Sequence, residues 1–374
     1  MTQYYIDSKY YKEEIRALLE QLSVKNILLV CGKSFYNLPI CSLIENLQRD
    51  RSINITYYED FSSNPKYEEV VQGVKVYCEN GCDFILAVGG GSAIDVAKCI
   101  KLFATLKKDE DYLEQEIIEN DIPLFAVPTT AGTGSEATQF AVIYVKGDKY
   151  SIEHESALPQ YVLLYPDNLI TLPDYQKKVT VCDALSHAVE SYWSLHSSIK
   201  SRKLSEAALC LMLDHMEEYL EGNGDVCREM MCASNLAGQA INITRTTAAH
   251  AMCYKLATLY HIPHGHAVMM CLPEVWEYME TKMDACIDER GQKYLCEILD
   301  SLAGCLRQKT QKAAIQFLKD VRSKLGLKLA KRVEEVPISM MVESVNLKRL
   351  QNFPIALTKE DLYRIYQKIL METR

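Results

Sequence analysis

Residues 84–98 of this 374-residue chain are FILAVGGGSAIDVAK. An apolar run leads into three glycines and a serine, and a helical pattern follows directly. Such a junction exposes backbone N–H groups at a helix N-terminus, where the helix dipole favours an anion such as a phosphate. The segment does not match GxGxxG, so the ordinary dinucleotide fingerprint is absent, and by itself it fits a plain turn equally well.

A second segment of the same kind changes this interpretation. Residues 128–136, PTTAGTGSE, also follow a predicted strand and offer hydroxyls and flexible backbone. Both segments would lie at the carboxyl edge of a parallel sheet, where ligands of open α/β sheets bind. Together they favour a dinucleotide site. Gly32-Lys33-Ser34 resembles the end of a P-loop, but Ile27 stands where its first glycine would be, so ATP hydrolysis is not predicted.

The pattern around these segments predicts two halves of different class. Strands alternate with helices as in βαβ units, a hairpin is expected around Gly147-Asp148, and the strand signals stop at Leu172-Pro173. The expected strands are residues 26–30, 54–58, 84–88, 124–127, 139–145, 149–154 and 161–165. We therefore predict an α/β domain over residues 1–172 and an all-helical domain over residues 173–374, packed around a cleft.

Composition excludes several classes of partner. The chain has 50 Asp and Glu against 41 Lys and Arg, a net charge of −9, which argues against nucleic-acid binding. No apolar run approaches the roughly 18 residues that span a bilayer, and the N-terminus lacks the features of a signal peptide. The 14 cysteines contain no CxxC pair and are expected to be reduced thiols. We expect a cytoplasmic protein with no membrane or nucleic-acid partner.

The helical half carries a candidate metal site. Asp183 and His187 are four residues apart, so on a helix they share one face. His250 falls in another helical segment, and His264 follows in IPHGHA, residues 262–267. One carboxylate and three imidazoles suit Fe²⁺ or Zn²⁺, with an open position for a substrate oxygen. A lone helical histidine is more often structural, but half of the eight histidines lie in or beside these motifs.

The motifs GGGSAIDVAK, PTTAGTGSEAT, DALSHAVESYWS, HAMCYKL and IPHGHAV, in this order, resemble those of the iron-containing (group III) alcohol dehydrogenases over nearly the whole chain. The resemblance implies a Rossmann-like N-terminal domain, a helical C-terminal domain, and a nicotinamide cofactor and catalytic metal between them. By position, Asp183, His187, His250 and His264 match the metal ligands. Positions that contact the cofactor are matched by Asn64, Gly90, Gly91, Ser92, Asp95, Thr129, Thr130, Thr133 and Lys149.

Departures from the family pattern bear on the proton donor and the cofactor. Many members have a further histidine where this chain has Tyr254, so His266 is the better candidate acid, although it could equally be structural. NAD-preferring members often have an aspartate after the first strand, which accepts hydrogen bonds from the ribose 2′-OH and repels a 2′-phosphate. This chain has Gly32 there, then Lys33 and Ser34, which can receive a phosphate. We predict NADP(H) over NAD(H), with a solvated Lys33 as the alternative.

The residues before His250 point to an anionic substrate. Arg245 is five residues from a metal ligand and, if buried, would need an anionic partner, either Glu190 or the substrate. His154 and Tyr254 are further candidates for the substrate pocket. The segments TRTTAAHAMCYKL, DKYSIEH and ESYWSLHSSIKSR resemble the branch that contains phosphonoacetaldehyde reductases of phosphonate biosynthesis. That resemblance implies reduction of phosphonoacetaldehyde to 2-hydroxyethylphosphonate.

Three other functions remain open at this stage. One is a general short-chain alcohol or aldehyde dehydrogenase of the same family. Another is a metal- and NAD-dependent lyase like the dehydroquinate synthases, which share the architecture. The third is a silent scaffold, although that would be expected to lose metal ligands. A homodimer is the family expectation.

Overall fold

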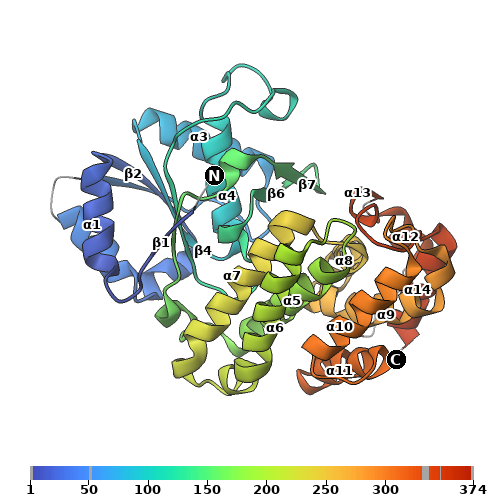
Figure 1. Cartoon of the computed structure of the whole chain (residues 1–374). Coiled ribbons are helices and arrows are strands. Elements are labelled where there is room, and N and C mark those ends of the chain that lie inside the picture. Colours follow the sequence, from blue (N-terminus) through green and yellow to red (C-terminus); the bar gives the residue numbers. More distant parts are fainter. Residues whose placement is uncertain (1–2, 50–52, 331–336, 346, 372–374) are drawn as a thin grey trace. The chain divides into compact units, whose positions relative to one another are not determined.

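The computed structural model describes residues 3–49, 53–330, 337–345 and 347–371 (Figure 1). The chain forms two compact units, residues 1–173 with 222–235, and residues 174–221 with 236–374. The first unit thus takes in a segment that the sequence-based division at residue 172 places in the helical half. The reason is visible at Asn235, which donates to the Glu136 carboxylate at 2.9 Å and accepts from the Tyr5 hydroxyl at 3.1 Å.

The first unit is built on a six-stranded parallel sheet with the order β1-β8-β5-β4-β2-β3, accompanied by the separate antiparallel pair β6-β7. Its strands are β1 (Tyr4–Ile6), β2 (Asn26–Cys31), β3 (Asn54–Tyr58), β4 (Phe84–Gly89), β5 (Leu124–Pro128), β6 (Phe140–Val145), β7 (Asp148–Glu153) and β8 (Tyr161–Leu163). Its α-helices are α1 (Tyr11–Gln21), α2 (Cys41–Arg49), α3 (Tyr67–Glu79) and α4 (Gly91–Phe103), with the start of α7 (Cys227–Thr244). Short 3₁₀ helices are η1 (Lys33–Asn37), η2 (Tyr112–Glu114), η3 (Ser135–Ala137), η4 (Glu155–Ala157), η5 (Pro166–Leu169) and η6 (Gly224–Val226).

Helices cover both faces of this sheet, which is why its central strands are apolar throughout. Leu28 and Val30 of β2 join a hydrophobic cluster with α3 and α4, whereas Ile27 and Leu29 join another with α1 and α2. Figure 1 shows α1 on one side of the strands and α3 and α4 on the other. The continuous run NILLV at residues 26–30 is therefore a fully buried parallel strand.

The strand order contains one topological switch point. The strands β3 and β4 follow β2 in sequence but pair with it on opposite sides. Connections leave the sheet in opposite directions there, so the carboxyl ends of β2 and β4 border a crevice in which such sheets bind ligands. Gly32 and the glycines after Val88 lie at those two ends.

Two details of the first unit differ from the sequence-based expectation. Edge strand β1, which pairs with β8, was not predicted, because its residues Tyr4 and Tyr5 are exposed and carry no apolar alternation. The β6-β7 hairpin is confirmed, but its turn is Lys146-Gly147, with φ of 53° and 92°. Two consecutive left-handed residues match the twist of paired strands, and the glycine tolerates this at no steric cost.

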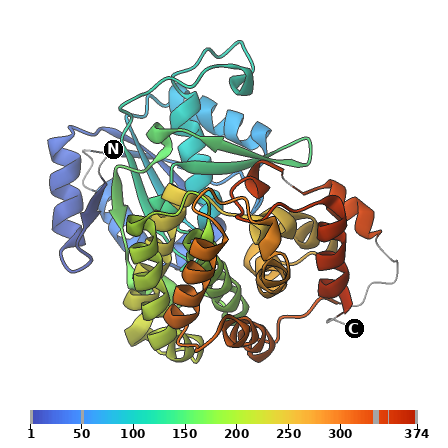
Figure 2. The same cartoon turned by 45° about the vertical axis from the view of Figure 1, so that its right-hand side comes forward.

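The second unit consists of helices in the part that the structure describes (Figure 2). They are α5 (Asp174–Trp193), α6 (Ile199–Leu220), the end of α7, α8 (Ala248–Tyr260), α9 (His264–Thr281), η7 (Met283–Ala285), α10 (Gln292–Cys305), α11 (Gln311–Lys324), α12 (Ile338–Glu343), α13 (Leu347–Leu350) and α14 (Lys359–Met371). The helix α9 packs against both α5 and α8. Among the described residues, no helix combines the length and apolarity needed to cross a membrane.

Candidate cofactor and metal sites

The two glycine segments lie side by side at the carboxyl edge of the sheet. Strand β4 runs into Gly90, the N-cap of α4, and the Thr129 backbone N–H donates to the Gly89 carbonyl at 3.0 Å. A Cβ added to Gly91 would stand 3.0 Å from the Thr133 side chain. This close approach explains why the turn is built from glycines. A helix N-terminus edged by threonine hydroxyls fits a pyrophosphate.

A third segment joins this edge. The Ser92 hydroxyl, in the first turn of α4, donates to the Ser63 carbonyl at 2.5 Å and so places the exposed Asn64 beside the glycine turn. The predicted cofactor residues Asn64, Gly90, Ser92, Thr130 and Thr133 thus come from three loops that converge at one edge of the sheet.

Asp95 has a structural task that the sequence did not reveal. Its Oδ1 accepts from the Ser135 hydroxyl at 2.6 Å and its Oδ2 from the Val142 N–H at 2.9 Å, so it fixes the second glycine segment and the hairpin to α4. Burial raises the pKa of Asp95, although the charge of Lys98, the hydrogen bond from Ser135 and the charge of Lys149 act to lower it.

Lys98, which sequence analysis missed, completes this network. The buried ammonium donates to the Ser135 carbonyl at 2.7 Å, the Thr138 hydroxyl at 3.1 Å and the Phe140 carbonyl at 2.6 Å. Burial lowers the pKa of Lys98 to about 8, although Asp95 and Glu136 act to raise it. The signal available in the sequence was its spacing, since Lys98 follows Asp95 by three residues on one helix face.

The carboxyl end of β2 shows what surrounds the predicted phosphate-receiving residues. Gly32 caps η1, and Lys33 and Ser34 are exposed in the first turn of that helix. Glu59, directly after β3, has Oε1 3.8 Å from the Cys31 Sγ. This carboxylate was not among the predicted site residues, and its proximity follows from the parallel pairing of β2 with β3.

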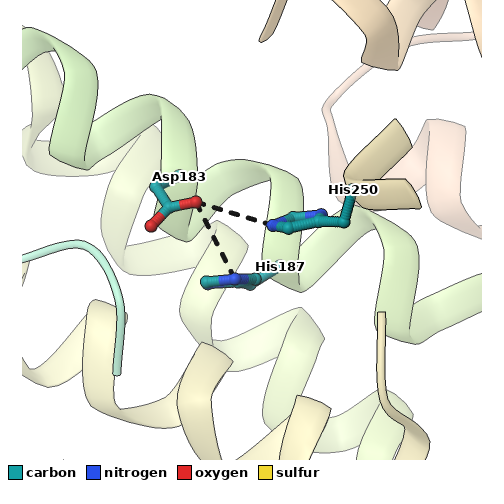
Figure 3. Close-up of side chains that lie close together, drawn as sticks. All are labelled: Asp183, His187 and His250. Atoms are coloured by element: carbon teal, nitrogen blue, oxygen red, sulfur yellow. Dashed lines mark ion pairs between the residues drawn. The ribbon is translucent and has the colours of Figure 1, made fainter. Parts of the chain in front are cut away.

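The predicted metal ligands assemble in the second unit. Asp183 and His187 project from one face of α5 toward His250 of α8 (Figure 3). Their ligand atoms lie within 4.8 Å of one another. Asp183 Oδ1 is 3.8 Å from His187 Nε2, 3.5 Å from His250 Nε2 and 3.8 Å from His264 Nε2. Four donors about 2.1 Å from one tetrahedral ion lie about 3.4 Å apart, so the spacing suits Fe²⁺ or Zn²⁺.

The electrostatics of this cluster agree with its spacing. Asp183 Oδ1 and His250 Nε2 are buried and form no hydrogen bond within the described residues. Buried polar atoms without a partner are costly, and a cation among them would satisfy both. Burial by itself raises the pKa of Asp183, but His187, His264 and His250 hold that pKa well below its usual range. The carboxylate is therefore ionised, as a metal ligand must be.

Glu190 holds His250 from the other side of its ring. Nδ1 of His250 is in close contact with Glu190 Oε2. The other oxygen of Glu190 accepts from the Thr247 hydroxyl at 2.5 Å and the Ala249 N–H at 2.9 Å. Burial would raise the pKa of Glu190, but His250 and these donors lower it. A carboxylate on Nδ1 leaves the Nε2 lone pair for a metal. Both Glu190 oxygens therefore contact His250 and the start of α8, and the pairing of Glu190 with Arg245, one of two alternatives drawn from the sequence, stays a prediction.

His264 closes the cluster on its accessible side. Its side chain is 36% exposed, against 2% for His250. The Tyr254 ring stacks on it, with centroids 5.5 Å apart and planes 8° apart, and the Cys253 thiol lies 3.5 Å from its Nδ1. Gly265 makes this position attainable, because a Cβ there would stand 1.9 Å from the Val179 carbonyl oxygen of α5.

His266 does not fit its predicted role as proton donor. It is buried, its Nδ1 is 2.9 Å from the Tyr175 hydroxyl, and burial lowers its pKa to about 4. An imidazole with that pKa is neutral at pH 7, so it carries no imidazolium proton to donate. Two residues apart on a helix, His264 and His266 point in different directions.

Arg245 also lies in other surroundings than its predicted role requires. It is exposed, at φ 57° directly after α7, so the cost of burying a charge does not apply to it. His154, the other candidate, belongs to the first unit, where its Nδ1 accepts from the Ser156 N–H at 3.1 Å. It lines a cavity with Glu119, Glu153 and Glu155, which is an acidic surrounding for an anion.

Comparisons with known proteins agree with both units. The family description "Iron-containing alcohol dehydrogenase" matches residues 3–166, and "Fe-containing alcohol dehydrogenase family, C-terminal" matches residues 178–370. The chain belongs to the iron-containing alcohol dehydrogenase family. It is an oxidoreductase, and both matches are to dehydrogenases and not to cyclising lyases.

Two curated relatives illustrate the range of this alcohol dehydrogenase family. Alcohol dehydrogenase 4 of Saccharomyces cerevisiae is 30% identical over 275 residues, which cover 71% of each chain. NADPH-dependent butanol dehydrogenase of Clostridium saccharobutylicum is 27% identical over 329 residues, 86% of this chain and 83% of the relative.

Solved structures of iron-containing alcohol dehydrogenases share the fold. The enzyme from Thermotoga maritima has a TM-score of 0.84 and 29% identity, and the match covers 99% of this chain and 98% of that one. Sulfoacetaldehyde reductase from Bifidobacterium kashiwanohense, solved with NAD⁺, has a TM-score of 0.84 at 24% identity, covering 99% and 96%. This second likeness shows the fold alone.

Proposed function

We propose that this iron-containing alcohol dehydrogenase reduces phosphonoacetaldehyde to 2-hydroxyethylphosphonate with NADPH, using Fe²⁺ or Zn²⁺ held by Asp183, His187, His250 and His264. The observation that carries the proposal is the convergence of one buried carboxylate and three imidazoles, with Asp183 Oδ1 3.5 to 3.8 Å from the Nε2 atoms of His187, His250 and His264. Reduction moves a hydride to the carbonyl carbon and a proton to its oxygen, so aldehyde, NADPH and a proton become alcohol and NADP⁺.

The chain's own residues prepare this reaction. A divalent ion bound in the cluster acts as a Lewis acid toward a carbonyl oxygen. Asp183 and His187 are fixed by one helix, and Glu190 sets the orientation and tautomer of the His250 ring. In the first unit, the glycine turn and Thr129, Thr130 and Thr133 are proposed to bind the cofactor, whose nicotinamide supplies the hydride.

The preference for NADP(H) rests on the carboxyl end of β2. Gly32 leaves room for a 2′-phosphate, and Lys33 and Ser34 can receive it. Glu59 works in the opposite direction, because a carboxylate near this edge repels a phosphate and favours a free 2′-OH. The relative named as an NADPH-dependent butanol dehydrogenase supports the preference for NADP(H).

Two variants separate these effects. No heavy atom lies within 4 Å of a Cβ built on Gly32, so Gly32→Asp is sterically free and should shift kcat/KM toward NADH. Glu59→Gln should shift it toward NADPH. The measurement is kcat/KM for both cofactors with one aldehyde. A strong NADH preference of the unaltered enzyme would overturn the NADPH proposal.

The substrate is tested against the second candidate function, a general short-chain alcohol or aldehyde dehydrogenase. The relatives named for alcohols and butanol favour that candidate. NADPH oxidation is compared with phosphonoacetaldehyde, propanal and butanal after anaerobic reconstitution with Fe²⁺ and, separately, Zn²⁺. Higher kcat/KM for the phosphonate supports the proposal, and preference for the uncharged aldehydes removes it.

We further propose a cytoplasmic homodimer that takes part in phosphonate biosynthesis. All 14 cysteines are thiols, which is typical of proteins in a reducing compartment. Light scattering of the purified protein tests the dimer, and fractionation of the source cells tests the location.

A further inference from the structure

The metal cluster is accessible from one direction. The side chains of Asp183, His187 and His250 are at most 7% exposed, whereas His264 is 36% exposed. An aldehyde that reaches the ion therefore passes His264, and the residues that surround this imidazole are in place to select among aldehydes.

Tyr254 lies against His264, and Arg349 lies against Tyr254. Tyr254 follows His250 by four residues on α8, so both face the cluster, and its ring stacks on His264. The Arg349 guanidinium carbon lies 5.6 Å from the centre of the Tyr254 ring. The three side chains thus form a continuous series from the cluster to a cation, assembled from α9, α8 and α13.

The position of the guanidinium is well defined. Arg349 donates to the hydroxyl of buried Thr246, and the Thr246 carbonyl accepts from the Asn352 side chain at 3.0 Å. Thr246 stands four residues before His250 and next to Thr247, which bonds to Glu190. The same short segment therefore anchors both the guanidinium and the metal cluster.

We propose that Arg349 binds the anionic end of an aldehyde substrate, with the Tyr254 ring beside it, while the carbonyl end reaches the metal cluster. This inference rests on the proposed function. A guanidinium presents its donors in a planar fork that matches a phosphonate, sulfonate or carboxylate through two parallel hydrogen bonds. The substrate class is a short aldehyde with a terminal oxyanion. Arg349 fills the role that sequence analysis gave to Arg245.

The kinetic test compares anionic and uncharged aldehydes. Arg349→Met keeps an unbranched apolar stem and removes the charged guanidinium, and Arg349→Lys keeps the charge without the fork. We expect Arg349→Met to raise KM for the preferred anionic aldehyde at least tenfold and to leave KM for propanal within twofold. For Arg349→Lys, we expect KM for the anionic aldehyde to lie between the values of the unaltered enzyme and Arg349→Met. Arg364→Met, an exposed arginine of α14 paired with Glu360, is the matched control.

A binding test does not depend on turnover. Calorimetric titration of metal-free protein with ethylphosphonate, methanesulfonate and propionate identifies which oxyanion Arg349 prefers. Binding should weaken at least tenfold in Arg349→Met and persist in Arg364→Met. The melting temperature of each variant shows that it is folded.

The outcomes separate the two proposals. If the enzyme oxidises neither NADPH nor NADH with any of the aldehydes tested, the proposed function is contradicted. An enzyme that reduces propanal but not phosphonoacetaldehyde, sulfoacetaldehyde or succinate semialdehyde keeps the family activity and overturns the role of Arg349. Equal KM changes for anionic and uncharged aldehydes in Arg349→Met also overturn it, as does an anion-selective effect in Arg245→Met alone.

Discussion

Among single residues, Glu190 shows best how much one side chain adds to the metal cluster. The motifs indicated the four ligands, whereas Glu190 was expected only as one of two alternative partners of Arg245. Asp183, His187 and Glu190 occur at helical spacing of four and then three residues, so a shared face was predictable. What the sequence could not show is that α8 brings His250 to this face, since that contact spans 60 residues.

The variant Glu190→Gln tests this contact. Gln keeps the size of the side chain but removes the charge that orients His250 and supports its basicity, so we expect a ten- to hundredfold loss of metal affinity. Competition between the protein and a chelating dye for Co²⁺ or Zn²⁺ measures this metal affinity. Glu297→Gln, an exposed carboxylate of α10, is the control. Unchanged affinity in Glu190→Gln would show that the contact is structural only.

At the scale of elements, the junction of α5 with α9 depends on the absence of a side chain at Gly265. A Cβ there would overlap the Val179 carbonyl oxygen, so Gly265→Ala must push the two helices apart. We expect a loss of about 2 kcal/mol or more in unfolding free energy, together with weaker metal binding because His264 moves away from Asp183. Urea unfolding and dye competition measure the two effects.

The matched control for that substitution is Gly304→Ala in α10. No heavy atom lies within 4 Å of a Cβ built there, so alanine should be neutral or stabilise the helix by up to about 1 kcal/mol. If both alanine variants had the same stability and metal affinity, close packing at Gly265 would not be what positions His264.

The start of α14 is fixed by a charged cap. The Asp361 carboxylate accepts from the Thr358 N–H at 2.8 Å and from the Tyr278 hydroxyl at 2.6 Å, and the Asp361 N–H donates to the Thr358 hydroxyl at 3.2 Å. Burial by itself raises the pKa of Asp361, but the hydrogen bonds from Thr358 and Tyr278, together with the charge of Lys282, lower it to about 2. Because the pKa of this carboxyl is lower in the folded state than in the unfolded state, ionisation of Asp361 stabilises the folded state. This contribution is complete above about pH 4 and is lost as the pH falls toward about 2.

Asp361→Asn should therefore lower the unfolding free energy by about 1 to 2 kcal/mol at pH 7 and have little effect near pH 2. Urea unfolding of chelator-treated protein at both pH values measures the difference, and Asp284→Asn, an exposed carboxylate, is the control. A deficit of equal size at both pH values would show that shape, and not charge, is what the cap requires.

For the whole molecule, the sequence predicted the class of each half better than its internal detail. The four central strands are confirmed within a residue or two because fully buried strands form unmistakable apolar runs. Edge strand β1 and the share of α7 that joins the first unit were missed, since long-range pairing decides both. Proximity of the glycine segments was predictable from parallel topology, whereas the burial of His266 and the exposure of Arg245 depend on packing.

Stability of the whole chain should respond to metal and not to thiol reagents. A ligand that binds only the folded state stabilises it by mass action, about 2.7 kcal/mol at a hundred times its Kd. Chelation should lower the melting temperature of metal-loaded protein, and added Fe²⁺ or Zn²⁺ should restore it. Dithiothreitol should have no effect, because the 14 cysteines form no disulfide. A chelator-insensitive melting curve would contradict a tightly held ion.

The four candidate ligands come from three helices, α5 and the consecutive pair α8 and α9, and none of these helices carries more than two of them. A partly folded chain that kept its helices but lost their packing would have no tight site. Metal content per chain in a fresh preparation therefore counts molecules in which α5, α8 and α9 have reached their final arrangement. It can serve as a direct assay of folding yield when the protein is produced in a foreign host.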